Sequence, residues 1–416
     1  MRVAVIVRAS RPNYKNVISD LLRSTSEFPS SVGHSLRLYI SADDTLKLMG
    51  PYRLSTPVES KFEAVRYIFD DDRQVLVSKV VHEQLGSRRL GNLLFLNKPY
   101  SYQLNSALAY AIADSNDLAL LFDDDQSFRI PVALRNSSVV WRYTDVIGSH
   151  IRALKNGAAV TTGPIVGSVS PIPESITATI PTSVRRRLGR LFEGAHEFVN
   201  ENTFVNPRCV VPSSAEVSRM TFASLRKPIW VSPANMGVDL RHFLPPFFNP
   251  PGARGEDAFF ALGLAPGASV VSVPAFIFHD PFLRYTEVHR GHFPTTLDPE
   301  PVTPASVNRL ADALIGWLRY VPLFLLCKWK HKSGAYEAHL RRKQALVESL
   351  SPILASRLGS ARLLEMASNL ELYSSRVSTD YENWLAVNAT WRERIIPWLW
   401  RERPCVGMPT SGGKEV

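Results

Sequence analysis

The stretch LALLFDDDQSF, residues 118–128, decides the fold. Five apolar residues, Leu118–Phe122, end at three consecutive aspartates, and a short apolar run bounded by polar residues predicts a buried strand. Such a strand would carry Asp123, Asp124 and Asp125 out of the sheet together. Adjacent carboxylates repel one another and are costly to bury without a counter-charge, which a hard divalent cation can supply. The pattern fits a metal site, and it fits a solvated acidic loop equally well.

The segments before this strand alternate between strand and helix patterns. Val3–Val7 and Ser35–Ile40 are compact β-type runs, and Val75–Val81 and Leu93–Leu96 are also predicted as strands. Residues 101–113 place their apolar side chains on one face of a helix. Strands alternating with helices predict an α/β fold with a mostly parallel central sheet and right-handed crossovers.

The segments after residue 128 are less regular. Ala158–Ile165 and Val271–Phe278 are predicted as strands, and residues 228–250 as a mixture of strand and loop. Gly255–Leu264 is predicted as a helix whose first turn carries Glu256 and Asp257, where the helix dipole favours negative charge.

From about residue 304 the chain is helical and poor in strands. We therefore predict an α/β unit over residues 1–300, a helical region over residues 301–403 and a disordered tail over residues 404–416. The segment Trp317–Lys332 mixes aromatic residues with lysines, which suits either a membrane interface or, as we favour, a helix packed on the main unit. The basic cluster within residues 185–190 is predicted to be a solvated helix face, with an anion clamp as the alternative.

The composition restricts partners and compartment. The 416 residues carry a net charge of +10, which favours an anionic partner such as a nucleotide, a phosphate-bearing lipid, a membrane surface or nucleic acid. The three cysteines are far apart and give no disulfide framework, which indicates a reducing compartment. No uninterrupted apolar run approaches the ~20 residues that span a bilayer. We expect a cytoplasmic protein, with peripheral contact at the inner face of a membrane as an option.

Polar groups follow several predicted strands in sequence order. They are Arg8, then Asp43 and Asp44, then the three aspartates, and finally His279. In a parallel sheet the carboxyl ends of strands meet at one edge, so these groups could converge on a ligand. The chain has no glycine-rich dinucleotide loop, phosphate loop or serine nucleophile elbow. The phosphates of any nucleotide would therefore be held by a metal and by side chains.

The order of these motifs resembles that of GT-A fold glycosyltransferases, closest to the family 2-like enzymes. The resemblance covers about residues 1–285 and rests on five segments. They are VAVIVRASRPNYKNVISDLL, LYISADDT, NKPYSYQLNSALAYA, LFDDDQSF and ANMGVDLRHFLPPFFNPPGARGEDAFFALGL. The fourth resembles the family's Asp-x-Asp motif, and the fifth resembles the acceptor-side segment that ends at a Glu-Asp pair.

The resemblance implies a Mn²⁺ or Mg²⁺ ion on Asp125 and Asp123, with His279 completing the metal shell. The ion would bridge the phosphates of a nucleotide-sugar donor. It further implies that Asp257, beside Glu256, is the general base that activates a hydroxyl of a glycan or lipid-linked glycan acceptor. Direct attack would invert the anomeric centre, although a late histidine is more typical of retaining families. The residues implied to bind the donor are Arg8, Asp43, Asp44, Asn105, Asp123 and Asp124.

Two other functions fit parts of the pattern. A nucleotidyltransferase can use a similar sheet with metal-binding aspartates, but it would normally have a glycine-rich loop where this chain has RASRPN. A degenerate transferase domain could instead serve as a binding protein. The chain lacks the Gln-x-x-Arg-Trp motif of processive synthases, so we expect single sugar additions. Nucleic acid is not expected as a partner.

Overall fold

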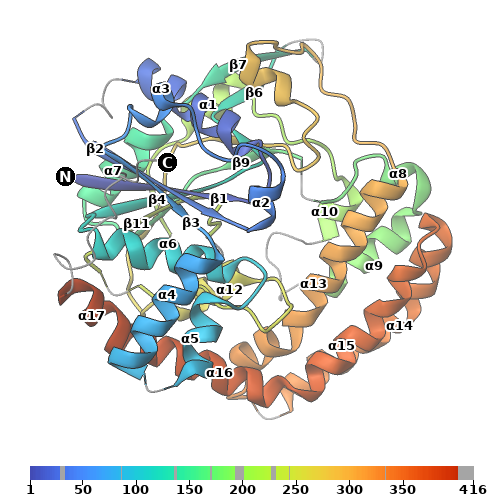
Figure 1. The fold of residues 1–416 in the computed structure, drawn as a ribbon. Helices are drawn as coiled ribbons and strands as arrows, with labels where there is room; N and C mark the ends of the chain where they lie inside the picture. Colours follow the sequence, from blue (N-terminus) through green and yellow to red (C-terminus); the bar gives the residue numbers. More distant parts are fainter. Residues whose placement is uncertain are drawn as a thin grey trace.

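The computed structural model describes residues 1–28, 33–85, 87–134, 138–168, 171–192, 201–225, 231–242, 244–332 and 334–401. Its centre is an eight-stranded sheet in the order β10-β12-β8-β11-β4-β1-β2-β3 (Figure 1). The strands, in that order, are Ala223–Leu225, Val270–Ser272, Val160–Thr162, Asn235–Asp239, Leu118–Asp123, Arg2–Ala9, Ser35–Ala42 and Ala64–Ile68. Only β10 and β11 run antiparallel to their neighbours, so the predicted mostly parallel α/β sheet is confirmed.

The two faces of strand β1 belong to different apolar cores. Val3, Val5 and Val7 face one core, which also contains side chains of helices α1 (Tyr14–Glu27) and α7 (Val146–Lys155). Ala4 and Ile6 face the other, which contains side chains of several helices below the sheet in Figure 1. Alternate residues of a strand point to opposite faces, so this apolar run is buried because helices cover both faces of the sheet.

The remaining helices of the α/β part are mostly short. They are α2 (Thr45–Leu48), α3 (Thr56–Glu59), α4 (Asp70–Val80), α5 (Arg88–Phe95), α6 (Ser101–Ala113), α8 (Ile176–Thr179), α9 (Thr182–Phe192), α10 (Glu201–Val205), α11 (Ser214–Arg219) and α12 (Glu256–Gly263). Helix α6 is buried along its whole length, so the apolar face predicted for residues 101–113 is only part of its buried surface.

Two predicted strands are helical. Val75–Val81 lies largely in α4, and Leu93–Leu96 lies largely in α5. In α4 the buried side chains include Leu76, Val77 and Val80, which recur at helical spacing. Three aspartates occupy its first turn, where negative charge is favourable. Helical periodicity and this favourable N-terminus therefore outweigh the β-propensity of the valines.

Two other predicted strands are each divided into two. Ala158–Ile165 becomes β8 of the main sheet and part of β9 (Ile165–Gly167). Val271–Phe278 becomes β12 of the main sheet and part of β13 (Ile277–His279). A second sheet has the order β5-β13-β9, where β5 is Gln126–Ser127, directly after the aspartates. The third sheet is the hairpin of β6 (Arg129–Ala133) and β7 (Val139–Tyr143).

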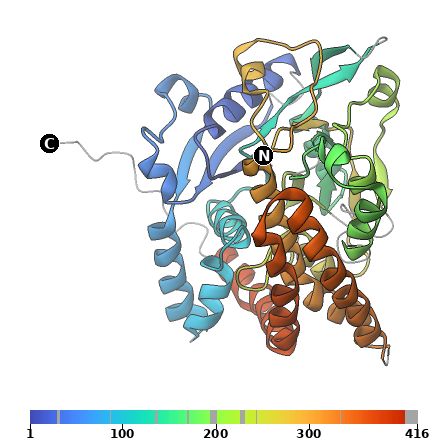
Figure 2. The same ribbon diagram turned by 90° about the vertical axis from the view of Figure 1, so that its right-hand side faces the viewer.

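The predicted helical C-terminal region is confirmed. Its helices are α13 (Pro304–Trp329), α14 (Ala335–Leu358), α15 (Glu365–Ser375), α16 (Val377–Thr390) and α17 (Ile396–Arg401). Figure 2 shows them gathered beneath the sheet. One apolar core continues from side chains of β4 and α6 into α13, α14 and α16. The sequence pattern predicts a domain boundary near residue 300, and this core extends across it. The predicted tail, residues 404–416, lies outside the described residues.

Helix α13 settles the interpretation of the aromatic segment near its end. It is the one helix among the described residues that is long and apolar enough to cross a membrane, and 78% of its apolar window is buried inside the protein. Trp317 is buried, whereas Lys328, Lys330 and Lys332 are exposed. The favoured alternative, a packed helix with its lysines in water, agrees with this burial.

The basic cluster of α9 differs from the predicted solvated face at one position. Arg185 is buried, and its guanidinium donates hydrogen bonds to the backbone oxygens of Ile180, Phe204 and Val205. It therefore ties α9 to α10, while Arg186 and Arg190 are exposed.

Candidate functional site

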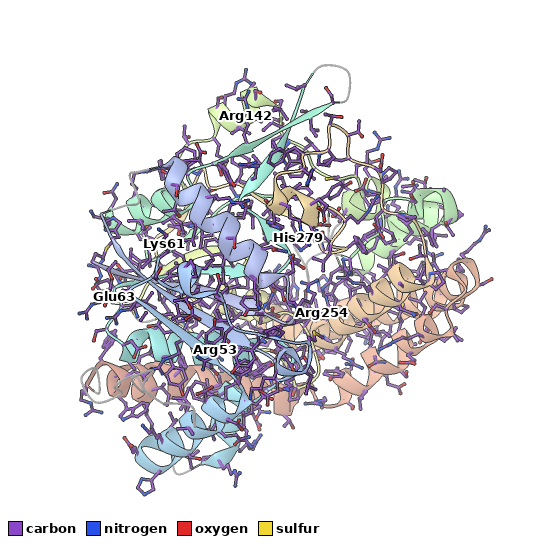
Figure 3. All side chains as sticks on the ribbon, turned by 45° about the horizontal axis from the view of Figure 1, so that its top comes forward. Arg53, Lys61, Glu63, Arg142, Arg254 and His279 are labelled. Carbon is purple, nitrogen blue, oxygen red and sulfur yellow. The ribbon has the colours of Figure 1, made fainter. Side chains whose placement is uncertain are left out.

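A cavity of about 670 Å³ opens beyond the carboxyl ends of β1 and β4. It receives side chains from the main sheet, the second sheet, the start of α12 and helix α13. In Figure 3 His279 and Arg254, from two of these elements, lie toward the middle of the view, whereas Arg142 and Glu63 lie toward its margin. The charged residues in its lining are Arg8, Arg11, Asp123, Asp124, Asp125, Arg254, Glu256, Asp257, His279, Arg309 and Asp312.

Arg8 is the centre of the charged wall. Parallel pairing places it directly opposite Asp123 on the neighbouring strand. Its guanidinium donates two hydrogen bonds to Asp123, at 2.8 and 2.6 Å, and one of 2.9 Å to Glu256 Oε1. It also lies 4.6 Å from the centre of the Tyr100 ring. Burial raises the pKa of Asp123 and of Glu256, and Arg8 counteracts that rise in both.

Asp124 anchors the loop that follows β1. Its carboxylate accepts hydrogen bonds from the backbone N–H groups of Ser10 (2.6 Å) and Arg11 (2.8 Å), and from the Arg11 guanidinium. Its side chain is almost fully buried. Asn13 donates to its backbone oxygen at 2.8 Å. The carboxylate oxygens of Asp124 are thus engaged by the protein itself and hold the start of this loop against the end of β4.

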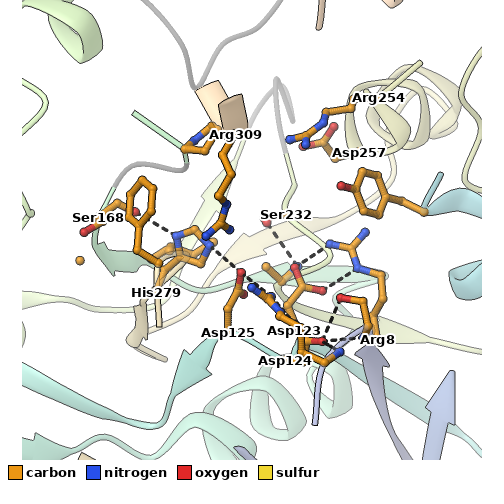
Figure 4. Close-up of a pocket in the computed structure, with 18 of the residues that line it drawn as sticks. Arg8, Asp123, Asp124, Asp125, Ser168, Ser232, Arg254, Asp257, His279 and Arg309 are labelled. Carbon is orange, nitrogen blue, oxygen red and sulfur yellow. Dashed lines mark hydrogen bonds and ion pairs between the residues drawn. The ribbon is translucent and has the colours of Figure 1, made fainter. Parts of the chain in front are cut away.

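Asp125 and His279 are neighbours on one wall of the cavity, and their side chains point toward each other (Figure 4). The distance from His279 Nε2 to Asp125 Oδ2 is 3.6 Å, and Arg11 lies 2.9 Å from the same oxygen. Burial by itself would raise the pKa of Asp125, but His279 and Arg11 together hold it below its usual range. Burial would lower the pKa of His279, and Asp125 reverses that shift and raises it.

The donor atoms at this point fit a divalent cation in part. Asp125 Oδ1 is buried without a hydrogen-bond partner among the described residues. His279 Nδ1 lies 2.9 Å from the Ser168 oxygen, so this nitrogen donates and Nε2 can act as a ligand when the ring is neutral. Asp123, the third predicted ligand, is already held by Arg8. Within the described ranges, no three His, Cys, Asp or Glu side chains are arranged so that together they could hold a metal ion. Two protein ligands would leave room for phosphate oxygens and water.

The first turn of α12 forms the opposite wall. Gly255 before it has φ +100°, and a Cβ atom there would lie 2.6 Å from the Tyr320 ring, so this sharp entry requires glycine. Glu256 turns toward Arg8, while Asp257 is half-buried and lines the cavity. Figure 4 shows Asp257 across the cavity from His279. A carboxylate there faces an open space large enough for a substrate hydroxyl.

Asp43 and Asp44 follow β2 at the same edge of the sheet but are not part of the cavity lining. Tyr102 donates a 3.2 Å hydrogen bond to Asp43, and Lys98 lies 3.7 Å from it. Asp44 accepts a 3.2 Å hydrogen bond from the backbone of Asp70.

Asn105 does not join the site. Its side-chain amide donates to the backbone oxygens of Leu94 and Phe247, each at 2.9 Å, and its oxygen accepts from Phe247 N at 2.8 Å. It is fully buried. These bonds engage its polar atoms and connect α5 and α6 to the backbone of Phe247, and Asn105 is not part of the cavity lining.

Sequence reasoning missed several residues that line the cavity. Arg11, Arg254, Arg309 and Trp317 were not predicted. Arg11 could have been found, because it follows the strand that pairs with the aspartate-bearing strand. Arg309 and Trp317 come from α13, and no short motif connects that helix to residues almost 200 positions earlier.

Comparisons with known proteins give structural matches only. No protein-family model matches the chain, and no curated protein matches it. Mannosyltransferase PcManGT from Pyrobaculum calidifontis, in complex with GDP-Man and Mn²⁺, is 12% identical, with 93% of this chain and 86% of that chain covered and a TM-score of 0.37. TarS 1–349 from S. aureus in complex with UDP is 13% identical, covers 91% of this chain and 92% of that chain, and has a TM-score of 0.33. Its complex with UDP-GlcNAc gives 12% identity, the same coverage and a TM-score of 0.30.

The chain is thus similar over most of its length to glycosyltransferases of known structure, the class that the sequence resemblance names.

Proposed function

We propose that the protein is a glycosyltransferase that moves a sugar from a nucleotide-sugar donor to a hydroxyl group of an acceptor. The observation that carries this proposal is the pairing of two features within one cavity. On one side of the cavity, Asp125 and His279 provide a carboxylate and an imidazole that could bind a metal ion. On the other side lies a second carboxylate, that of Asp257. Transfer of a sugar between phosphate and hydroxyl requires both a place for a diphosphate and a base for the acceptor.

Asp257 takes the base role in this proposal. As the acceptor oxygen bonds to the anomeric carbon, Asp257 accepts the hydroxyl proton, and the bond from that carbon to the diphosphate oxygen breaks with its electron pair. Direct displacement inverts the anomeric centre. Glu256 holds Arg8, and Arg8 in turn holds Asp123, so these residues keep the strand ends and the start of α12 in place.

Asp125, whose Oδ1 has no hydrogen-bond partner among the described residues, and His279 would hold a Mn²⁺ or Mg²⁺ ion, which would supply positive charge to the leaving diphosphate. Asp43 and Asp44 would contact the nucleoside at the adjoining edge of the sheet. The printed titles of the matched structures name GDP-Man, UDP and UDP-GlcNAc, which makes these donors the first to test.

The acceptor we propose is a glycan or a lipid-linked glycan in the cytoplasm. Any peripheral membrane contact would involve the exposed lysines at the end of α13, because the rest of that helix is packed. The basic and aromatic residues at the end of α13 support this acceptor, and the three widely spaced cysteines support this compartment.

The test is release of nucleoside diphosphate from a panel of nucleotide sugars, with Asp257→Asn as the variant. Loss of the base should reduce turnover by about 10²–10⁴-fold and leave donor affinity within about twofold. Asp71→Asn, at a side chain 91% exposed, is the matched control and should behave as wild type. Unchanged turnover in Asp257→Asn would remove the base assignment. Release of pyrophosphate from a nucleoside triphosphate would favour a nucleotidyltransferase, and no nucleotide binding at all would favour a binding protein.

A further inference from the structure

The arginines that line the cavity fall into two groups. Arg8 and Arg11 each contact two acidic side chains. Arg254 and Arg309 have no ion pair and no side-chain hydrogen bond within the part of the chain that the structure describes. Each guanidinium lies near an aromatic ring: Arg254 is 5.6 Å from the Tyr100 ring centre, and Arg309 is 5.0 Å from that of Phe282.

Both unpaired guanidinium groups face the cavity and neither is fully exposed. Figure 4 shows Arg309 extending from α13 toward His279 and Asp125, and Arg254 beside Asp257 on the other side. Arg11, Asp125, Arg254 and Arg309 all line this one cavity. Burial and the like charges of Arg11 and Arg254 lower the pKa of Arg309, and the carboxylates of Asp125 and Glu300 offset part of that shift.

The protein alone gives these two arginines an unfavourable environment. Partly buried cations without counter-ions lose hydration, and like charges around one space repel. The neighbouring carboxylates relieve the repulsion only in part. Asp125 and Glu300 act to raise the pKa of Arg309, yet it stays lowered. Asp123 and Asp124 are held by Arg8 and Arg11, and Asp312 is paired with Arg362. An anionic ligand would relieve it. A planar guanidinium can donate two parallel hydrogen bonds to a pair of phosphate oxygens, in bidentate geometry.

We propose that Arg309, with Arg254 opposite it, binds the diphosphate group of the donor. This inference rests on the proposed function and adds a specific binding element to it. The diphosphate would lie between the Asp125–His279 wall and the two arginines, where negative charge develops as the bond to the anomeric carbon breaks. Part of its binding would then need no metal. The helical C-terminal region, through α13, would form one side of the donor site.

The first experiment measures binding of inorganic pyrophosphate by titration calorimetry, in EDTA and separately with Mn²⁺. Wild-type protein should bind pyrophosphate in EDTA, and Arg309→Gln should weaken binding about 10–100-fold, the effect of losing charge-assisted hydrogen bonds. Arg309→Lys should recover part of the loss, because it restores charge without the fork. Arg290→Gln, at a side chain 69% exposed and paired outside the cavity, is the control. Circular dichroism confirms that each variant is folded.

Equal pyrophosphate affinity in wild type and Arg309→Gln would overturn the inference, as would the absence of metal-free binding. The second experiment separates the donor from a phosphorylated acceptor. With an active sugar donor, Arg309→Gln should raise the donor KM at least tenfold, whereas a rise confined to the acceptor KM would overturn the donor assignment. Pyrophosphate binding that depends on Arg309, in a protein that transfers no sugar, would leave the anion site standing and remove the proposed function.

Discussion

Replacing Arg8 with methionine should lower the free energy of unfolding by about 3–5 kcal/mol, the usual effect of removing one partner from a buried ion pair. Arg8 contacts two carboxylates, Asp123 at 2.6 Å and Glu256 at 2.9 Å, and the side chains of all three residues are 15% exposed or less. Methionine keeps much of the aliphatic part of the arginine side chain, so the change in stability reports mainly the loss of the guanidinium. The carboxylates left behind repel each other in a poorly hydrated place, and the upper half of the range is expected.

The assay is urea-induced unfolding at pH 7, followed by tryptophan fluorescence. Arg290→Met is the matched control, because Arg290 forms an exposed ion pair with Glu287 and such pairs contribute about 0–1 kcal/mol. If Arg8→Met lost no more stability than Arg290→Met, Arg8 would not be the element that links β1, β4 and α12.

Two further predictions concern buried polar residues. Asn105→Ala should lower the free energy of unfolding, measured in urea, by about 2–4 kcal/mol, because it leaves buried backbone groups of Phe247 and Leu94 without hydrogen-bond partners. A loss of nucleotide affinity with unchanged stability would instead support a donor-binding role for Asn105. His150 lies between Thr161 and Asn235, and burial lowers its pKa from 6.5 to about 4. Its pKa is higher in the unfolded chain, so the stability linked to neutral His150 is complete above about pH 6.5 and is lost as the pH falls toward 4, up to about 3 kcal/mol. His150→Asn should remove that part of the pH dependence in urea titrations at pH 4, 5, 6 and 7, and an unchanged dependence would contradict it.

The sequence was informative wherever a structural signal was local. The strands at residues 3–7 and 118–122 were predicted because an apolar run this compact is buried on both faces. Val75–Val81 misled because valine has high β-propensity, while the helix depends on burial of Leu76, Val77 and Val80 against distant residues. Tertiary packing overrides propensity in such a segment.

The candidate site shows the same division between local and distant information. The aspartates were found from the sequence, but their counter-charge was expected to be a metal, and arginines from the neighbouring strand and loop supply much of it. His279 was expected at the end of a main-sheet strand and lies in the second sheet, because the chain leaves the main sheet after β12. It still reaches Asp125, because β13 pairs with the short strand that follows the aspartates.

The apolar core that runs without interruption from the sheet into α13, α14 and α16 has a practical consequence for engineering. Chimeras that exchange the last hundred residues between related transferases would cut through shared packing and not through a linker. A graft at this junction would need to redesign both surfaces together, since neither half presents a finished exterior to solvent.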